Sequence, residues 1–218
     1  MKFAIIVFPG SNCDYDAYYA LKNIGYNVEF VWHKNTSLSG FDGILIPGGF
    51  SYGDYLRTGA IAKFSPIMKS IKEESKKGKV IIGICNGFQI LIESELLPGS
   101  LINNSNIKFI SKEVVLNIKT SNSIFTKYID SKQLRMPIAH KQGNYIADNE
   151  TLKKLRDNDQ VLFEYESNPN GSMQRIAGIT NKKRNVLGMM PHPERASDKL
   201  LGSIDGKYIF ESVLKSYV

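Results

Sequence analysis

The sequence lacks the features of an exported or membrane-bound chain. Its 218 residues include only two cysteines, Cys13 and Cys85, and contain no run of 18 apolar residues. A membrane-spanning helix needs such a run, so we expect no contact with a membrane. The apolar segment 3–8 is too short for a secretory signal and continues into Pro9-Gly10, which is typical of a first strand entering a loop. Two cysteines in such a chain indicate reduced thiols, and we expect a cytoplasmic protein.

Nucleotide and metal motifs are missing as well. The chain has no G-x-x-x-x-G-K-[ST] phosphate loop, no dinucleotide fingerprint after residues 9–12, and no zinc-ligand spacing. We therefore expect no metal and no cofactor in this chain. The formal net charge is +7, but the basic residues are dispersed, and the small clusters at 76–79 and 182–184 fall in predicted turns. This pattern argues against nucleic acid as a partner. The positive charge could instead help to bind an acidic protein partner or attract anionic metabolites.

The composition, with 42% hydrophobic and 22% charged residues, is that of an ordinary globule. Strand and helix signals alternate, which predicts an α/β fold with a mostly parallel central sheet and helices on both faces. Alternating polarity in 107–118 predicts additional antiparallel strands. We expect one domain over residues 1–218. The other predicted strands are 3–8, 28–32, 43–47, 80–84, 136–139, 161–165, 175–179 and 186–190, and the predicted helices are 14–23, 60–77, 88–96 and 204–217.

The most informative segment is Gly83-Ile84-Cys85-Asn86-Gly87, where a β-branched run meets a run with helical spacing. The G-x-C-x-G pattern is that of a nucleophile elbow with sulfur at its apex. Glycines at 83 and 87 would let strand and helix approach, and the helix amides from Asn86 onward would favour the thiolate. A cysteine is more often an inert core residue, so this pattern alone does not decide the role.

A second segment, Pro191-His192-Pro193-Glu194, follows the predicted strand 186–190. A thiol nucleophile needs a base, and the base needs a group that fixes its tautomer. His192 and Glu194 supply these two residue types. A loop histidine is usually only solvated, so this segment indicates a catalytic base only in combination with the elbow cysteine.

A third segment, Pro47-Gly48-Gly49-Phe50, leaves a strand through two glycines. Such a loop can point backbone N–H groups outward. Together with the amide of Asn86 it can form an oxyanion hole, although a Gly-Gly pair by itself predicts only a turn.

These segments resemble the class I glutamine amidotransferases. The resemblance extends over residues 8–196, and the segments FPGSNCD (8–14) and PGGFSYGDYLR (47–57) are most similar to members that serve purine biosynthesis. It implies a class I amidotransferase fold, which is flavodoxin-like, and a triad of Cys85, His192 and Glu194. It also implies an oxyanion hole from Gly49 or Phe50 with Asn86, and substrate contact by Gln89.

The resemblance further implies that L-glutamine is the substrate and that its ammonia is used elsewhere. A large synthetase subunit would bind ATP and Mg²⁺ and aminate formylglycinamide ribonucleotide, with a small third subunit present. One departure is Lys141-Gln142, where similar proteins carry Gly-Glu in the segment A-H-G-E-G-N-Y. Two other classes stay open: an elbow-thiol hydrolase or redox-protective protein, and a non-catalytic assembly subunit.

Overall fold

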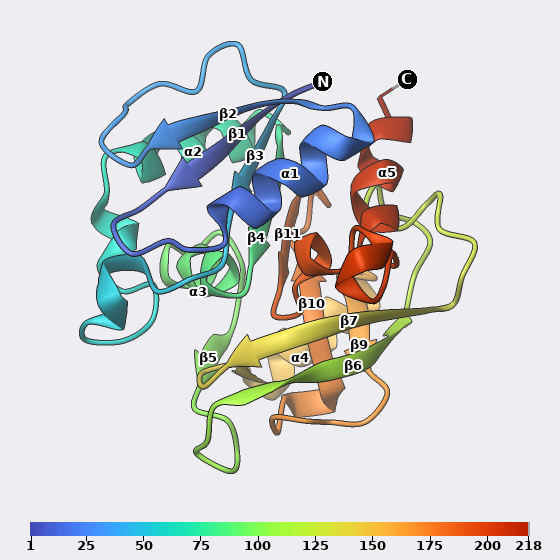
Figure 1. The fold of residues 1–218 in the computed structure, drawn as a ribbon. Helices are drawn as coiled ribbons and strands as arrows, with labels where there is room; N and C mark the ends of the chain where they lie inside the picture. The colour runs from blue at the N-terminus through green and yellow to red at the C-terminus, as the bar shows by residue number, and fades with distance from the viewer. Residues whose placement is uncertain (218) are drawn as a thin grey trace.

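The computed structural model describes residues 1–217, which form a nine-stranded sheet and a separate strand pair (Figure 1). The order in the large sheet is β2-β1-β3-β4-β11-β10-β9-β6-β7, and the small pair is β5-β8. The bounds are β1 (Lys2–Val7), β2 (Asn27–Trp32), β3 (Gly43–Ile46), β4 (Val80–Ile84), β5 (Ser100–Ile102), β6 (Ile110–Ile118), β7 (Gln133–His140), β8 (Asn144–Ile146), β9 (Val161–Tyr165), β10 (Ile176–Thr180) and β11 (Val186–Met189).

The large sheet has a parallel half and an antiparallel half. Strands β2, β1, β3, β4 and β11 run parallel, whereas β10, β9, β6 and β7 pair antiparallel beyond them. The parallel half has the strand order of flavodoxin-like folds. Every residue of β4 is buried, as expected of a central strand covered on both faces. The predicted fold class is therefore confirmed.

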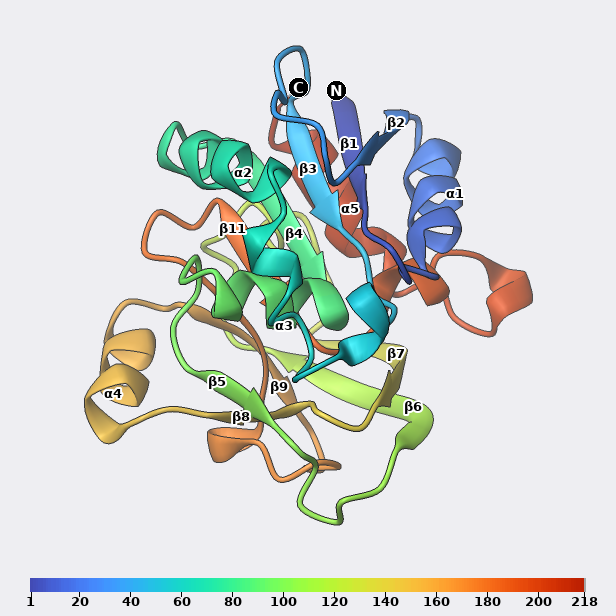
Figure 2. The ribbon, with the colours of Figure 1, turned by 90° about the vertical axis from the view of Figure 1, so that its left-hand side faces the viewer.

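Helices cover both faces of the parallel half. Figure 2 shows α2 (Ile67–Lys76) and α3 (Asn86–Glu93) on one side and α1 (Asp14–Ile24) and α5 (Lys207–Lys215) on the other. A fifth helix, α4 (Asn149–Asp157), precedes β9 and packs through two buried leucines.

One predicted helix needs correction, and one observed helix is absent from the predictions. The predicted helix 60–77 is broken: a 3₁₀ turn (Ala62–Phe64) ends at Ser65, whose backbone is extended, and α2 begins after Pro66. Proline disfavours helical backbone in the residue before it and supplies no N–H, so the break falls at this position. Helix α4 was not predicted because only Leu152 and Leu155 form its apolar face.

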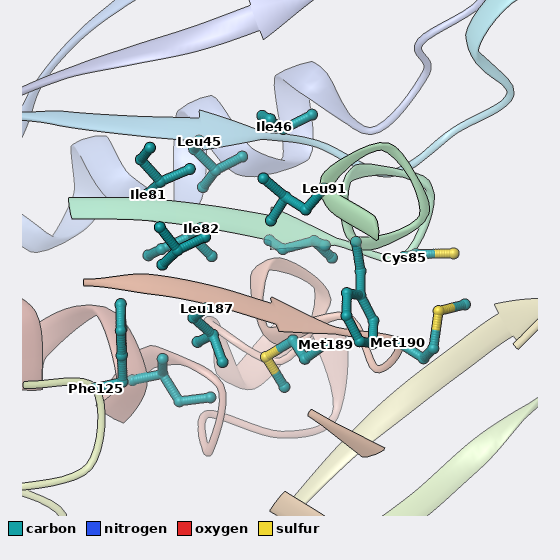
Figure 3. Close-up of a cluster of buried hydrophobic side chains, with 14 of the residues drawn as sticks. Leu45, Ile46, Ile81, Ile82, Cys85, Leu91, Phe125, Leu187, Met189 and Met190 are labelled. Atoms are coloured by element: carbon teal, nitrogen blue, oxygen red, sulfur yellow. The ribbon is translucent and has the colours of Figure 1, made fainter. Parts of the chain in front are cut away.

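The core between β4 and β11 positions the functional residues. Figure 3 shows Cys85 where β4 leaves a cluster of buried side chains that includes Leu45, Ile82 and Leu187. Parallel strands end at one edge of a sheet, so the loops after β1, β3, β4 and β11 meet there. In such folds ligands bind at this edge, where the strand order reverses, here between β1 and β3.

Candidate active site

Cys85 lies at the turn from β4 into α3. Its backbone has φ 50° and ψ −103°, a conformation that L residues rarely adopt. Its N–H donates to the Met189 carbonyl on β11 at 2.8 Å, and helix α3 starts at the next residue. The predicted strand, sharp turn and helix with a thiol at the apex are confirmed.

The two glycines of the elbow are required by close packing. A Cβ atom on Gly87 would lie 2.0 Å from the Ile46 carbonyl oxygen. A Cβ atom on Gly83 would lie 2.4 Å from Leu91 Cδ1 and 2.8 Å from the carbonyl carbon of Gly87. Strand and helix therefore approach as closely as the G-x-C-x-G pattern predicted.

His192 and Glu194 form a buried pair in the loop after β11. The His192 N–H donates to the Pro137 carbonyl at 2.9 Å, and the His192 Nδ1 atom lies 2.6 Å from Glu194 Oε1. A carboxylate only accepts, so Nδ1 carries the proton and Nε2 is the basic atom. Within residues 1–217, the buried Nε2 has no hydrogen-bond partner and is left for proton transfer.

The surroundings of His192 favour its protonated form. Burial lowers the pKa of His192. The charge of Glu194 and the thiols of Cys85 and Cys13 raise it by a larger amount, so the pKa of His192 lies well above its usual value. A histidine that readily holds a proton beside a thiol favours the thiolate, which is the nucleophilic form. Cys85, His192 and Glu194 are thus brought together, and their catalytic roles stay a prediction.

Gly48 lies against the residues of this cluster. A Cβ atom at Gly48 would lie 2.8 Å from His192 Cε1, 3.3 Å from Cys13 Sγ and 3.5 Å from Cys85 Cβ. The loop after β3 therefore packs directly against the imidazole and both cysteines. A residue with a side chain would collide with His192 at this position.

Cys13 belongs to the same cluster but has different partners. Its Sγ atom accepts a hydrogen bond from Arg195 Nη2 at 3.1 Å, and Arg195 Nε donates to Asp16 at 3.0 Å. Ligand atoms of Cys13, His192 and Glu194 lie within 4.8 Å of one another, which is near enough for a metal ion. Because Arg195 and the His192–Glu194 bond already use these atoms, the cluster fits a hydrogen-bonded triad better than a metal site.

A glutamine-like diazo-ketone is expected to label Cys85 and leave Cys13 unmodified. Cys85 lines a cavity at the elbow, whereas Cys13 is not among the residues lining it and is held by Arg195. Peptide mapping by mass spectrometry measures the modification at each thiol, and Cys13→Ala is the matched control. Labelling of Cys13 with Cys85 intact would contradict the assignment of the nucleophile.

The predicted oxyanion hole stays a prediction, and the structure bears on which amides are available for it. The Phe50 N–H donates to the Gly10 carbonyl at 3.1 Å, so this amide is already engaged. Gly49 has φ 128°, and a Cβ atom there would lie 2.6 Å from the Asn12 nitrogen. Asn86 is the first residue of α3, where N–H groups have no acceptor within the helix. The structure favours Gly49 over Phe50 as the partner of Asn86, and the Phe50 side chain lines the cavity instead.

Gln89 belongs to a hydrogen-bond network that joins three segments. Its Nε2 atom donates to the Gln142 carbonyl at 2.6 Å, and its Oε1 atom accepts from Asn86 Nδ2 at 2.9 Å. The Gln142 side-chain oxygen accepts from Thr58 Oγ1 at 2.8 Å, and Asn86 Oδ1 accepts from the Ser51 N–H at 3.0 Å. Gln142, one of the two residues that depart from the family pattern, therefore connects the loop after β7 to helix α3 and to the loop after β3.

These segments enclose a cavity of about 180 Å³ beside Cys85. Its lining residues are Gly49, Phe50, Asp54, Thr58, Cys85, Gln89, Phe109, Ala139, His140, Lys141 and Gln142. Sequence reasoning did not assign Asp54, Thr58, Phe109 or Ala139 to the site, although Asp54 stands in the segment 47–57 that carried the resemblance.

His140 is a neutral acceptor in this cavity. Asn104 donates from Nδ2 to two carbonyls, so its Oδ1 atom accepts, and the His140 Nδ1 atom 3.0 Å away carries a proton. The opposite Nε2 is unprotonated and lacks a partner in the described part of the chain. Burial, with a smaller effect of His192, lowers the pKa of His140 to about 4.

A flavodoxin-like sheet with an elbow cysteine, and with a histidine–glutamate pair in the loop after the adjacent strand, is typical of enzymes that attack a carbonyl carbon with sulfur. The profile of the CobB/CobQ-like glutamine amidotransferase domain matches residues 1–209. The chain belongs to this family of glutamine amidotransferases.

Solved structures agree with the family. A chain in the "Structure of PurLQS from Thermotoga maritima" is 43% identical, with coverage of 100% of this chain and 99% of that chain and a TM-score of 0.92. A putative GMP synthase protein from Thermoplasma acidophilum is 17% identical, with coverage of 100% and 96% and a TM-score of 0.67. A glutamine amidotransferase from Thermotoga maritima is also 17% identical, with coverage of 99% and 91% and a TM-score of 0.59. The last two share the fold.

Within residues 1–217, no helix has the length and apolar character needed to cross a membrane.

Proposed function

We propose that this chain is the glutaminase subunit of phosphoribosylformylglycinamidine synthase. It hydrolyses L-glutamine and supplies ammonia to a synthetase that converts formylglycinamide ribonucleotide, with ATP, to formylglycinamidine ribonucleotide in purine biosynthesis. The observation that carries the proposal is the cavity beside Cys85 and the His192–Glu194 pair, in a chain 43% identical over its full length to one in PurLQS.

The geometry supports a thioester mechanism. The Cys85 thiolate attacks the side-chain amide carbon of glutamine, and the amides of Gly49 and Asn86 stabilise the resulting oxyanion. His192 donates its proton to the departing ammonia, so the C–N bond breaks and a thioester remains. His192 then accepts a proton from water, whose oxygen attacks the thioester and releases glutamate and the thiolate. Glu194 holds the imidazole in the required tautomer throughout.

The synthetase half of the reaction is assigned to other chains. We propose that a large subunit binds ATP and Mg²⁺, that a small third subunit joins the complex, and that this chain needs no cofactor. The complex is expected in the cytoplasm. Neither nucleic acid nor a membrane has a role in this function.

Two alternatives lead to different results with glutamine. An elbow-thiol hydrolase or redox-protective protein would use Cys85 on another substrate, and an assembly subunit would use it on none. Release of glutamate from glutamine separates the proposal from both. The His192–Glu194 bond of 2.6 Å favours a catalytic role for the cluster over pure assembly.

Glutaminase activity is expected to be low in the isolated chain and to rise when the partner docks. The loop after β3 carries three non-glycine residues with positive φ, namely Tyr52, Asp54 and Leu56, and such strain is common in segments that change conformation. The Tyr55 and Leu56 side chains of this loop are 72% and 81% exposed, which leaves them free to contact a partner. A coupling of this kind typically changes activity by about 5- to 150-fold.

The test compares glutamate release by this chain alone and with the large subunit, the small subunit, ribonucleotide substrate and ATP. Docking of a chain with net charge +7 should also slow as salt rises. Equal turnover in both settings would contradict activation by the partner. Asp130→Asn, an exposed change away from this loop, is the control for a nonspecific effect of charge.

A further inference from the structure

Strand β2 is an open edge of the large sheet, where it pairs with β1 alone. The N–H groups of Asn27 and His33 donate to carbonyls on the β1 side, and the bonding direction of a strand alternates from one residue to the next. The backbone groups of Val28, Phe30 and Trp32 therefore point away from the sheet. In the described part of the chain, the N–H groups of these three residues have no hydrogen-bond acceptor.

The opposite edge strand, β7, is covered by another segment of the chain. The Arg135 N–H donates to Asp205 Oδ2 at 2.7 Å, and the Arg135 carbonyl accepts from Ser203 Oγ at 2.9 Å. Pro137 has no N–H to offer, and its carbonyl accepts from the His192 N–H at 2.9 Å. An uncovered edge is a template for pairing with another strand, and proteins usually block it as at β7. The edge of β2 has no comparable cover among the described residues.

Exposed aromatic side chains lie beside this open edge. Phe30 and Trp32 are 39% and 45% exposed, and Tyr15 and Tyr19 of helix α1 are 61% and 56% exposed. The Phe30 ring centroid lies 5.0 Å from those of Tyr15 and Tyr18. Figure 2 shows α1 beside β2 at this margin of the sheet. A group of exposed aromatic residues is typical of a surface that contacts another protein.

The charges of β2 do not protect it against pairing. Proteins often guard an edge strand with charged side chains, most often lysine. The one charged residue in β2 is Glu29, and Lys2 Nζ lies 2.8 Å from its Oε1. The strand therefore presents a nearly neutral edge to a second strand.

We infer that β2 pairs antiparallel with β2 of a second copy of this chain, so that the large sheet continues across both copies. A twofold axis at Phe30 places Phe30 opposite Phe30 of the second copy, and Val28 opposite Trp32 of the second copy. The three residues with outward backbone groups then all form hydrogen-bonded pairs, because such pairs alternate along an antiparallel ladder. Glu29 lies opposite Val31 of the second copy, which avoids placing two like charges face to face.

A second copy suits this edge because the same register maps the strand onto itself, as a twofold interface requires. Side chains of alternate residues share one face of a strand, so Val28, Phe30 and Trp32 meet their counterparts on the face that carries α1. Aromatic pairs across two strands stabilise such a sheet. None of the residues that line the cavity belongs to β2 or α1, so pairing along this side of the sheet leaves the cavity free.

The experiment measures the mass of the full chain by sedimentation velocity across about 1–500 μM, because an interface built on one strand pair is small. We expect the wild type to shift from monomer to dimer within this range. Phe30→Lys should weaken association by about 100-fold or more, since it places two lysines opposite each other at the twofold axis. Ile102→Lys is the matched control, because Ile102 is 42% exposed on β5, and it should associate like the wild type.

A second measurement uses the fluorescence of Trp32, the one tryptophan of the chain. Its emission should move to shorter wavelength as the wild type associates and stay constant in Phe30→Lys, while circular dichroism checks that the variant is folded. A wild type that stays monomeric across the range would overturn the inference, as would a Phe30→Lys variant that associates like the wild type. If Trp32 emission responds only when a synthetase subunit is added, the edge binds a different chain and the inference is wrong.

Discussion

Replacing Cys85 with alanine will lower glutamine-dependent synthesis by about 10⁶-fold, which is effectively to background, while synthesis from added ammonia continues. The side chain contributes little to folding, because its one hydrogen bond within residues 1–217 is a weak 3.7 Å interaction with the Ala139 carbonyl. Its loss removes the atom that forms the thioester and leaves the partner's amination chemistry untouched. The measurement is the rate of formylglycinamidine ribonucleotide formation in the reconstituted complex with either nitrogen source.

The matched control for this experiment is Cys13→Ala. Cys13 is a buried thiol in the same cluster, but Arg195 is its partner and it is not among the residues lining the cavity. We expect this variant to retain most glutamine-dependent activity. If Cys85→Ala also stopped synthesis from ammonia, Cys85 would have a structural or assembly role instead of a catalytic one.

The second large effect is a graded loss along the His192–Glu194 pair. His192→Ala removes the proton carrier and should reduce glutaminase activity nearly as much as loss of the nucleophile, because groups of one catalytic unit are not additive. Glu194→Gln keeps the shape but offers an N–H to His192 Nδ1, which favours the wrong tautomer. A change of this kind costs about 10⁴-fold in enzymes with a comparable triad.

Steady-state glutamate release measures both variants, with ammonia-dependent synthesis as the control for correct assembly. Because Glu194 is buried and bonded to His192 at 2.6 Å, its effect is expected in kcat, with little change in KM. Equal activity of Glu194→Gln and the wild type would contradict the role of Glu194 in orienting the imidazole.

The sequence predicted the parallel half of the fold well because its strands are buried on both faces. A short, continuous apolar run between turn residues, such as Val80–Ile84, is typical of a buried strand. Helix α4 was missed because its two leucines give a weak periodic signal. The Asp148 side chain that accepts from the Thr151 N–H is an N-cap signal by which the helix could have been found.

The candidate site was predictable where chemistry depends on local pattern. The elbow is formed by five consecutive residues, and His192 and Glu194 are only two positions apart, so both features can be recognised from a short segment of sequence. The contacts of Gln142 with Thr58 and of Asn86 with Ser51 join residues 84 and 35 positions apart, so they depend on how the loops meet in space. The same is true of Asp54, whose neighbours in sequence say nothing about the cavity that its carboxyl group faces.

The backbone of Cys85 has a consequence for how selection acts on this chain. A φ of 50° strains any residue with a side chain, at a cost of about 1–3 kcal/mol, and glycine would relieve most of that strain. A subunit kept only for assembly would therefore gain stability from every mutation that replaced this cysteine by glycine. A strained cysteine is therefore expected at this position only where its reactivity outweighs the stability that glycine would add. The strained backbone of Cys85 therefore argues against a subunit that serves only in assembly.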